Sequence, residues 1–80
     1  MNLYYIKNIN EIGYDHYEGH VIAARNESEV RNIAAQKTTT EKTGEGAKTW
    51  LGSGSTVTLI GIAASDITNP TVILSAFRNG

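Results

Sequence analysis

The chain has 80 residues and no cysteine, and its seven basic and eight acidic residues leave a formal net charge of −1. A chain of this length forms one small domain, residues 1–80, which buries only about 60% of the surface that its unfolded form exposes. The lack of cysteine excludes disulfides and thiolate metal ligands, so we expect a partner protein or a second copy of the chain to supply further stability. The balanced charge argues against nucleic acid as a partner.

The sequence contains no segment that is typical of a membrane protein. Its longest apolar run, residues 59–64, is far shorter than the roughly 20 residues that cross a bilayer. The first ten residues lack the charged and apolar pattern of a signal peptide. We therefore expect a cytoplasmic protein.

Four segments are predicted to be strands. Residues 3–9 and 20–25 are rich in β-forming residues, and the second of these leads directly into a helix. Residues 56–64 are almost continuously apolar, which predicts a central position in the sheet, and Gly61 within them predicts a bulge or a close approach of the helix. Residues 71–77 follow an Asn-Pro turn, so the last two strands are most simply an antiparallel hairpin.

One helix is predicted over residues 26–36. Asn26 has the short polar side chain that caps a helix, and Glu29 can reach back to the N–H group of Asn26. Val30, Ile33 and Ala34 then form one apolar stripe, with Arg31 on the outer side. Residues 10–19 and 36–49 are predicted to be long loops, after which Trp50 returns to the core or caps its edge. The order β-β-α-β-β predicts an α+β fold, with one helix packed on a four-stranded, mostly antiparallel sheet in a two-layer sandwich.

The two histidines, His16 and His20, have the spacing that would place two metal ligands on one face of a helix. Gly19 lies between them in a segment predicted to be loop and strand, so we interpret them as exposed loop histidines and expect no metal or other cofactor. The glycines before Lys48 and Thr49 do not match a phosphate-binding loop, because Ala47 stands where that pattern requires glycine.

The sequence does not indicate an enzyme. It has no thiolate nucleophile and no serine in a nucleophile elbow, and both histidines fall in one predicted loop. Glu27 and Glu29 are explained by capping of the helix. We therefore predict no catalytic residues.

The loop at residues 11–18 is the main candidate for a contact surface, because it combines acidic and aromatic side chains with no basic residue. Its tyrosines either bind a partner or fold back onto the edge of the sheet. The second long loop carries lysines that alternate with glutamates, which makes phosphate contact the weaker interpretation. The predicted partner-binding residues are Tyr14, Asp15, His16, Tyr17, Glu18, Arg31, Lys37, Lys42 and Lys48.

A resemblance to a group of proteins rests on the segment GYDHYEG, the strand that ends in Ala-Ala-Arg, and the acidic helix cap that follows. This pattern resembles small phage and prophage proteins, and its first half resembles some anti-CRISPR proteins. The closing residues VILSAFRNG are similar to the end of the same group. The resemblance implies a non-enzymatic inhibitor that binds a Cas effector complex of the bacterial host and blocks it sterically. Two alternatives are a self-assembling structural or accessory phage protein, which forms dimers through an exposed edge strand, and a weak nucleic-acid-binding module that uses the lysine loop.

Overall fold

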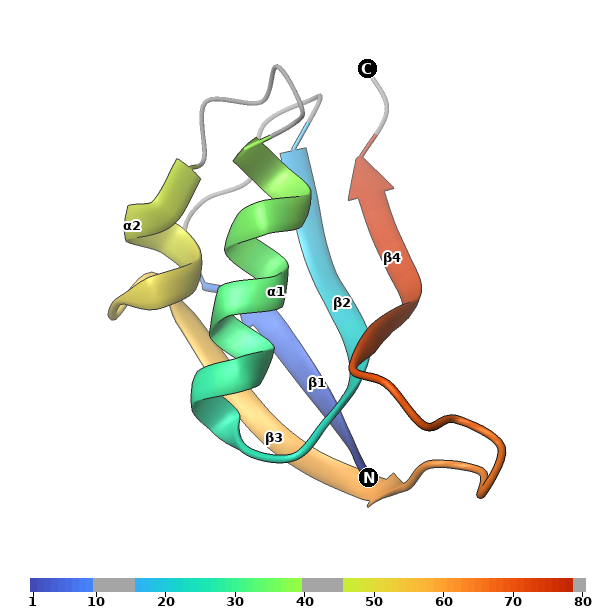
Figure 1. Ribbon diagram of the computed structural model, residues 1–80. Coiled ribbons are helices and arrows are strands. Elements are labelled where there is room, and N and C mark those ends of the chain that lie inside the picture. The colour runs from blue at the N-terminus through green and yellow to red at the C-terminus, as the bar shows by residue number, and fades with distance from the viewer. Residues whose placement is uncertain (10–15, 40–45, 79–80) are drawn as a thin grey trace.

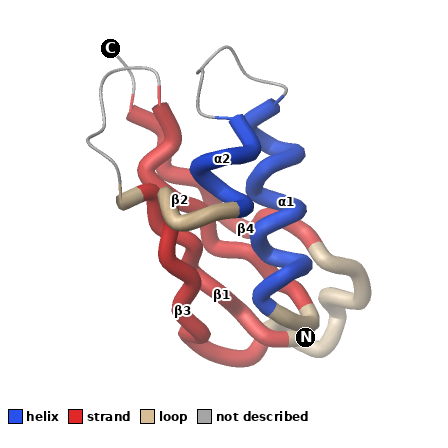
Figure 2. Tube along the Cα trace, turned by 90° about the vertical axis from the view of Figure 1, so that its left-hand side faces the viewer, coloured by secondary structure: helices blue, strands red, loops and turns tan. Residues whose placement is uncertain are grey.

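The computed structural model describes residues 1–9, 16–39 and 46–78, which form one antiparallel sheet with helices on one of its faces (Figure 1). The elements in chain order are β1 (Asn2–Asn8), β2 (His16–Ala24), α1 (Glu27–Thr39), α2 (Gly46–Leu51), β3 (Ser55–Ile62) and β4 (Thr71–Arg78). Seen from the side, the two helices form one layer beside the sheet (Figure 2). The predicted two-layer α+β fold is confirmed, with α2 added to the expected order of elements.

The strands lie in the order β3-β1-β2-β4, and each neighbouring pair is antiparallel. The predictions of a central β3 and of a β3–β4 hairpin are therefore wrong, because these two strands form opposite edges of the sheet. The connection at residues 63–70 passes the ends of β1 and β2. Four strands place the outer two about 14 Å apart, which eight extended residues, with a reach of about 26 Å, can span.

The core lies between the two central strands and the helices. Alternate residues of β1 and β2 face the helices, so Ile6, Ile22 and Ala24 are fully buried. Val30 and Ala34 of α1 pack onto them, as the predicted apolar stripe requires. The complete buried cluster is Ile6, Tyr17, Ile22, Ala24, Val30, Ala34, Ala35 and Trp50.

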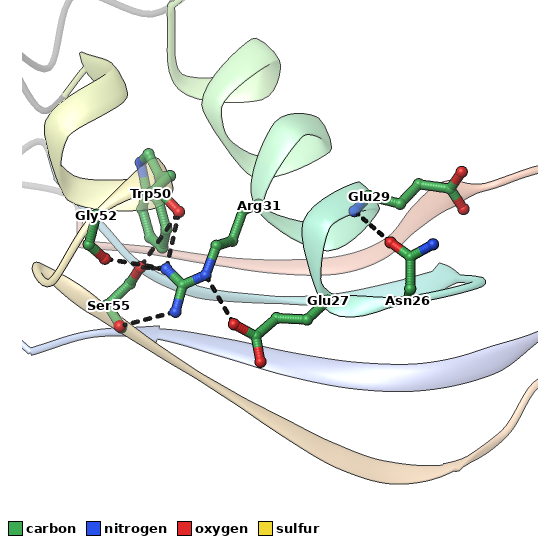
Figure 3. A network of polar contacts seen from close by, with 7 residues as sticks. All are labelled: Asn26, Glu27, Glu29, Arg31, Trp50, Gly52 and Ser55. Atoms are coloured by element: carbon green, nitrogen blue, oxygen red, sulfur yellow. Dashed lines mark hydrogen bonds and ion pairs between the residues drawn. The ribbon is translucent and has the colours of Figure 1, made fainter.

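Helix α1 begins where the sequence predicts. The side-chain oxygen of Asn26 accepts a hydrogen bond of 2.9 Å from the backbone N–H of Glu29 (Figure 3). The carboxylate of Glu29 accepts a bond of 2.9 Å from the backbone N–H of Arg25, one residue before the predicted donor. The helix continues to Thr39 instead of ending at residue 36, because Ala35 extends the buried stripe and Lys37 complements the negative end of the helix dipole.

Helix α2 corrects the prediction of a loop over residues 36–49. The end of α1 and the start of α2 occupy both ends of that segment, and residues 40–45 lie outside the described ranges. A helix of six residues is too short to be stable alone. Its anchor is Trp50, whose side chain is completely buried against the core.

Two glycines of the sheet have different structural roles. A Cβ atom at Gly19 would lie 2.7 Å from the carbonyl oxygen of Ile6 and 2.8 Å from the ring of Tyr5. At Gly61 nothing lies within 4 Å, so no helix approaches it. The register between β1 and β3 shifts opposite Gly61, which confirms the bulge that the sequence predicts there.

Replacement of Gly19 by alanine is expected to lower the free energy of unfolding by about 1–2 kcal/mol, because a backbone carbonyl and an aromatic ring must both shift. The matched substitution Gly61→Ala has open space and should change stability by about 0.5 kcal/mol or less. Urea denaturation of both variants measures the difference. Equal effects of the two substitutions would contradict the close approach at Gly19.

Candidate functional site

The chemically versatile side chains of the described residues gather around His20, beneath the helices. The His20 side chain is only 1% exposed, and its Nδ1 atom lies 2.7 Å from the hydroxyl oxygen of Ser75 on β4. Its ring centroid is 4.8 Å from that of Tyr17 and 4.9 Å from that of Trp50. The cluster therefore joins β2, β4 and α2 in one buried contact.

Burial keeps His20 neutral. Desolvation lowers the pKa of His20 from 6.5 to about 4, and the positive charge of Lys37 adds to this effect. Within the described residues, neither Nε2 of His20 nor Nε1 of the Trp50 indole has a hydrogen-bond partner. A second proton on the ring, which makes the imidazolium, would therefore add a charge where no described side chain compensates it.

The close contact of Ser75 and His20 has the residue types of a nucleophile and its general base. Its environment does not suit that chemistry, because the imidazole is sealed from solvent and its pKa lies far below neutral. Ser75 itself is half-buried. The contact is best explained as a satisfied polar pair that ties the edge strand β4 to β2.

Lys37, at the end of α1, belongs to the surroundings of the same cluster. Its ammonium group lies 5.9 Å from the centroid of the Tyr17 ring, within the range of a cation–π interaction. Lys37 is half-buried and takes part in other contacts as well. Its side chain therefore contributes to packing in addition to any role in binding a partner.

Arg31 has a structural role, which corrects the prediction that it is available to a partner. Its guanidinium donates hydrogen bonds to the carbonyl oxygens of Trp50 at 3.1 Å and Gly52 at 3.0 Å (Figure 3). It also donates to the hydroxyl and the carbonyl oxygen of Ser55, at 2.9 and 3.4 Å. Its Nε atom pairs with the carboxylate of Glu27 at 3.2 Å. The side chain thus fastens α1 to the connection between α2 and β3.

The other predicted contact residues have different outcomes. Tyr17 is only 6% exposed and lies in the core. Of the two roles predicted for the tyrosines, partner binding and folding back onto the sheet, the second applies to Tyr17. The prediction that His20 is an exposed loop histidine is wrong, because His20 faces the helices from within β2. Glu18 is half-buried on the same strand. His16 begins β2 and Lys48 lies in α2, whereas Tyr14, Asp15 and Lys42 fall outside the described ranges.

The described residues contain no group of three or more potential metal ligands, whether histidine, cysteine, aspartate or glutamate. Residues 10–15, which include Asp15, lie outside that search. No helix in the described part of the chain is long and apolar enough to cross a membrane.

Most of the large apolar side chains that are exposed in the described residues lie on β3 and β4, the two edge strands of the sheet. On β4 the side chains of Ile73 and Leu74 are exposed, Leu74 to 65%. Among the described strands, β4 pairs only with β2, so its outer row of backbone N–H and C=O groups has no strand neighbour (Figure 1). At its end, Arg78 pairs with His16, the residue at which the acidic and aromatic segment 11–18 enters β2.

The buried cluster around His20 and the edge positions of β3 and β4 were not predicted from the sequence, although the sequence contains one signal for the cluster. His20 stands in the same strand phase as Ile22 and Ala24, both of which are buried, and this alternation places it on the core face. The edge positions of β3 and β4 depend on pairing with distant strands, which the local pattern does not specify.

The fold and the site together define a small open-sheet α+β protein, in whose described part the strands β3 and β4 form the two edges of the sheet and His20 lies buried beneath the helices. Comparison of the chain with protein-family models, with curated proteins and with solved structures finds no match.

Proposed function

We propose that this chain is a non-enzymatic protein-binding domain that docks on its partner through β4 and the segment that leads into β2. The observation that carries this proposal is the outer edge of β4, which has no neighbour among the described strands and presents Ile73 and Leu74 beside its backbone. An incoming strand can bind such an edge through main-chain hydrogen bonds, with apolar side chains adding selectivity.

The register between β2 and β4 supports the same docking surface. Because His16 pairs with Arg78, the acidic and aromatic segment joins the sheet at the C-terminal end of the free edge. A partner bound along β4 would therefore reach both the exposed apolar side chains and the start of β2. The exposed side chains of Ile73 and Leu74 would form the apolar centre of such an interface.

The partner that follows from the resemblance to anti-CRISPR proteins is a Cas effector complex in the cytoplasm of the bacterial host. The domain would act by steric block, which requires a stable surface and no catalytic group. The sealed environment of His20 is compatible with this mode of action. A plaque assay of phage on CRISPR-active cells tests the proposal, and absence of protection by the wild-type protein would refute the Cas assignment.

The substitution Leu74→Lys is expected to weaken partner binding by about tenfold or more, because it places a charge in an apolar contact. The side chain is largely exposed, so the free energy of unfolding should change by about 0.5 kcal/mol or less. Pull-down from cells that carry CRISPR systems, together with the plaque assay, measures the effect. The control is Leu51→Lys, an exposed leucine at the end of α2, a helix that lies on the opposite side of α1 from β4 in Figure 1. Full inhibition by the Leu74 variant would show that β4 is not the binding edge.

A further inference from the structure

The second free edge of the sheet, β3, carries no charge. Residues 52–65 contain no acidic or basic side chain and no proline, and β3 occupies eight of them. Natural edge strands are usually protected from pairing by lysine, proline or inward-pointing charges. The bulge near Gly61 lies towards the end of β3 and the guanidinium of Arg31 contacts Ser55 at its start, so neither protects the middle of the strand.

The edge is also apolar. Leu59 and Ile62 are exposed to 60% and 82%, and Ile60 between them is exposed as well. The exposed side chain of Ile9 lies near the start of β3. The backbone N–H of Ile9 donates a hydrogen bond of 3.0 Å to the carbonyl oxygen of Gly54, directly before that strand. Among the described strands β3 pairs only with β1, so its outer edge combines unpaired backbone groups with large apolar side chains, which is the combination that favours strand addition.

We propose that a second copy of this chain covers the edge, with β3 of each copy pairing antiparallel to β3 of the other. A strand that pairs with itself brings its own charges together, and the uncharged stretch at residues 52–65 removes that repulsion. A domain of 80 residues without disulfides also gains the stability that its small core does not supply. The contact is isologous, so it closes at two copies.

The symmetry of the dimer follows from the antiparallel pairing. Two antiparallel copies of one strand in a continuous sheet are related by a two-fold axis perpendicular to that sheet, so both helical layers lie on the same side. The dimer then has one eight-stranded sheet, whose two outer strands are the β4 strands of the two copies. This inference does not depend on the function proposed for β4.

The test compares matched pairs of lysine substitutions at the two edges. The wild-type chain is expected to sediment with about twice the monomer mass of 8.7 kDa. The double substitution Thr58→Lys with Ile60→Lys places exposed lysines at the middle of β3 and should raise the dimer Kd by about tenfold or more. The control, Ile73→Lys with Leu74→Lys, adds the same charge to β4 and should leave the dimer intact.

A second pair of variants, with glutamate in place of lysine, distinguishes loss of the dimer from loss of the fold. The variant Thr58→Glu with Ile60→Glu should also be monomeric, and an equimolar mixture with the lysine variant should restore a dimer. Circular dichroism verifies that each variant is folded. A wild-type monomer at every concentration up to roughly 1 mM, a dimer that the β3 lysines leave unchanged, or a dimer that the β4 lysines disrupt would each overturn the proposal.

Discussion

Replacement of Arg31 by alanine is expected to lower the free energy of unfolding by about 3–4 kcal/mol, a large share of the stability of a small domain. The substitution removes four hydrogen bonds to the connection between α2 and β3 and the ion pair with Glu27. The hydroxyl and carbonyl groups of the buried Ser55 would lose their charged donor. Urea denaturation followed by circular dichroism measures the loss.

The structure offers a matched arginine as control. Arg25 lies just before α1 and contacts Glu29 at 3.6 Å on the surface, and Arg25→Ala should cost about 0.5 kcal/mol or less. The variant Arg31→Lys keeps the charge without the planar fork of donors, so it should recover only a minor part of the loss. Similar stabilities of the Arg25 and Arg31 alanine variants would contradict the structural role of Arg31.

The second large effect is a loss of stability in acid that comes from His20. Its pKa is about 4 in the folded chain and 6.5 in the unfolded chain, so the unfolded state binds the proton more strongly. The full contribution of His20 is present above pH 6.5 and is lost as the pH falls through about 4. The loss from this residue should approach roughly 3 kcal/mol. Urea denaturation at a series of pH values measures it.

The variant His20→Phe separates the loss of stability in acid that His20 causes from the loss that protonation of the carboxylates causes. It keeps an aromatic ring between Tyr17 and Trp50 and removes the titrating group, so the fall in stability between pH 6.5 and 4 should become much smaller. Trp50 is the only tryptophan of the chain, and its ring contacts His20, so its fluorescence reports on the same site. An unchanged pH profile in the phenylalanine variant would rule out His20 as the source.

The parts of the fold that could be predicted depend on local chemistry. Asn26 marks the start of α1, because its cap needs only a side chain and a backbone group three residues later. The apolar stripe of Val30 and Ala34 likewise follows from the helical period. These features led to the correct α+β class.

The parts that could not be predicted depend on tertiary contacts. The segment before Trp50 has no apolar periodicity, and α2 exists because that single side chain is buried. The apolar run of β3 is equally compatible with a central and an edge strand, and only its pairing with β1 decides between them.

The roles of the candidate site residues also depend on tertiary contacts that the local sequence does not specify. Tyr17 was predicted to bind a partner because it lies in an acidic and aromatic loop, and Arg31 because the helical period places it on the outer side of the helix. In the folded chain the aromatic ring packs in the core and the guanidinium joins two elements. A single sequence does not distinguish an arginine that holds the protein together from one that contacts a partner.

The separation of β3 and β4 also determines how the chain folds. Asn2 at the start of β1 pairs with Ile62, sixty positions later in the sequence. The local contacts of β1, β2 and α1 can form before this pairing does, but both outer strands come from the last third of the chain. Sheets with such distant pairings fold on the scale of milliseconds to seconds. During synthesis, β1 therefore lacks its partner β3 until residues 55–62 have left the ribosome, and β2 lacks β4 until residues 71–78 have followed.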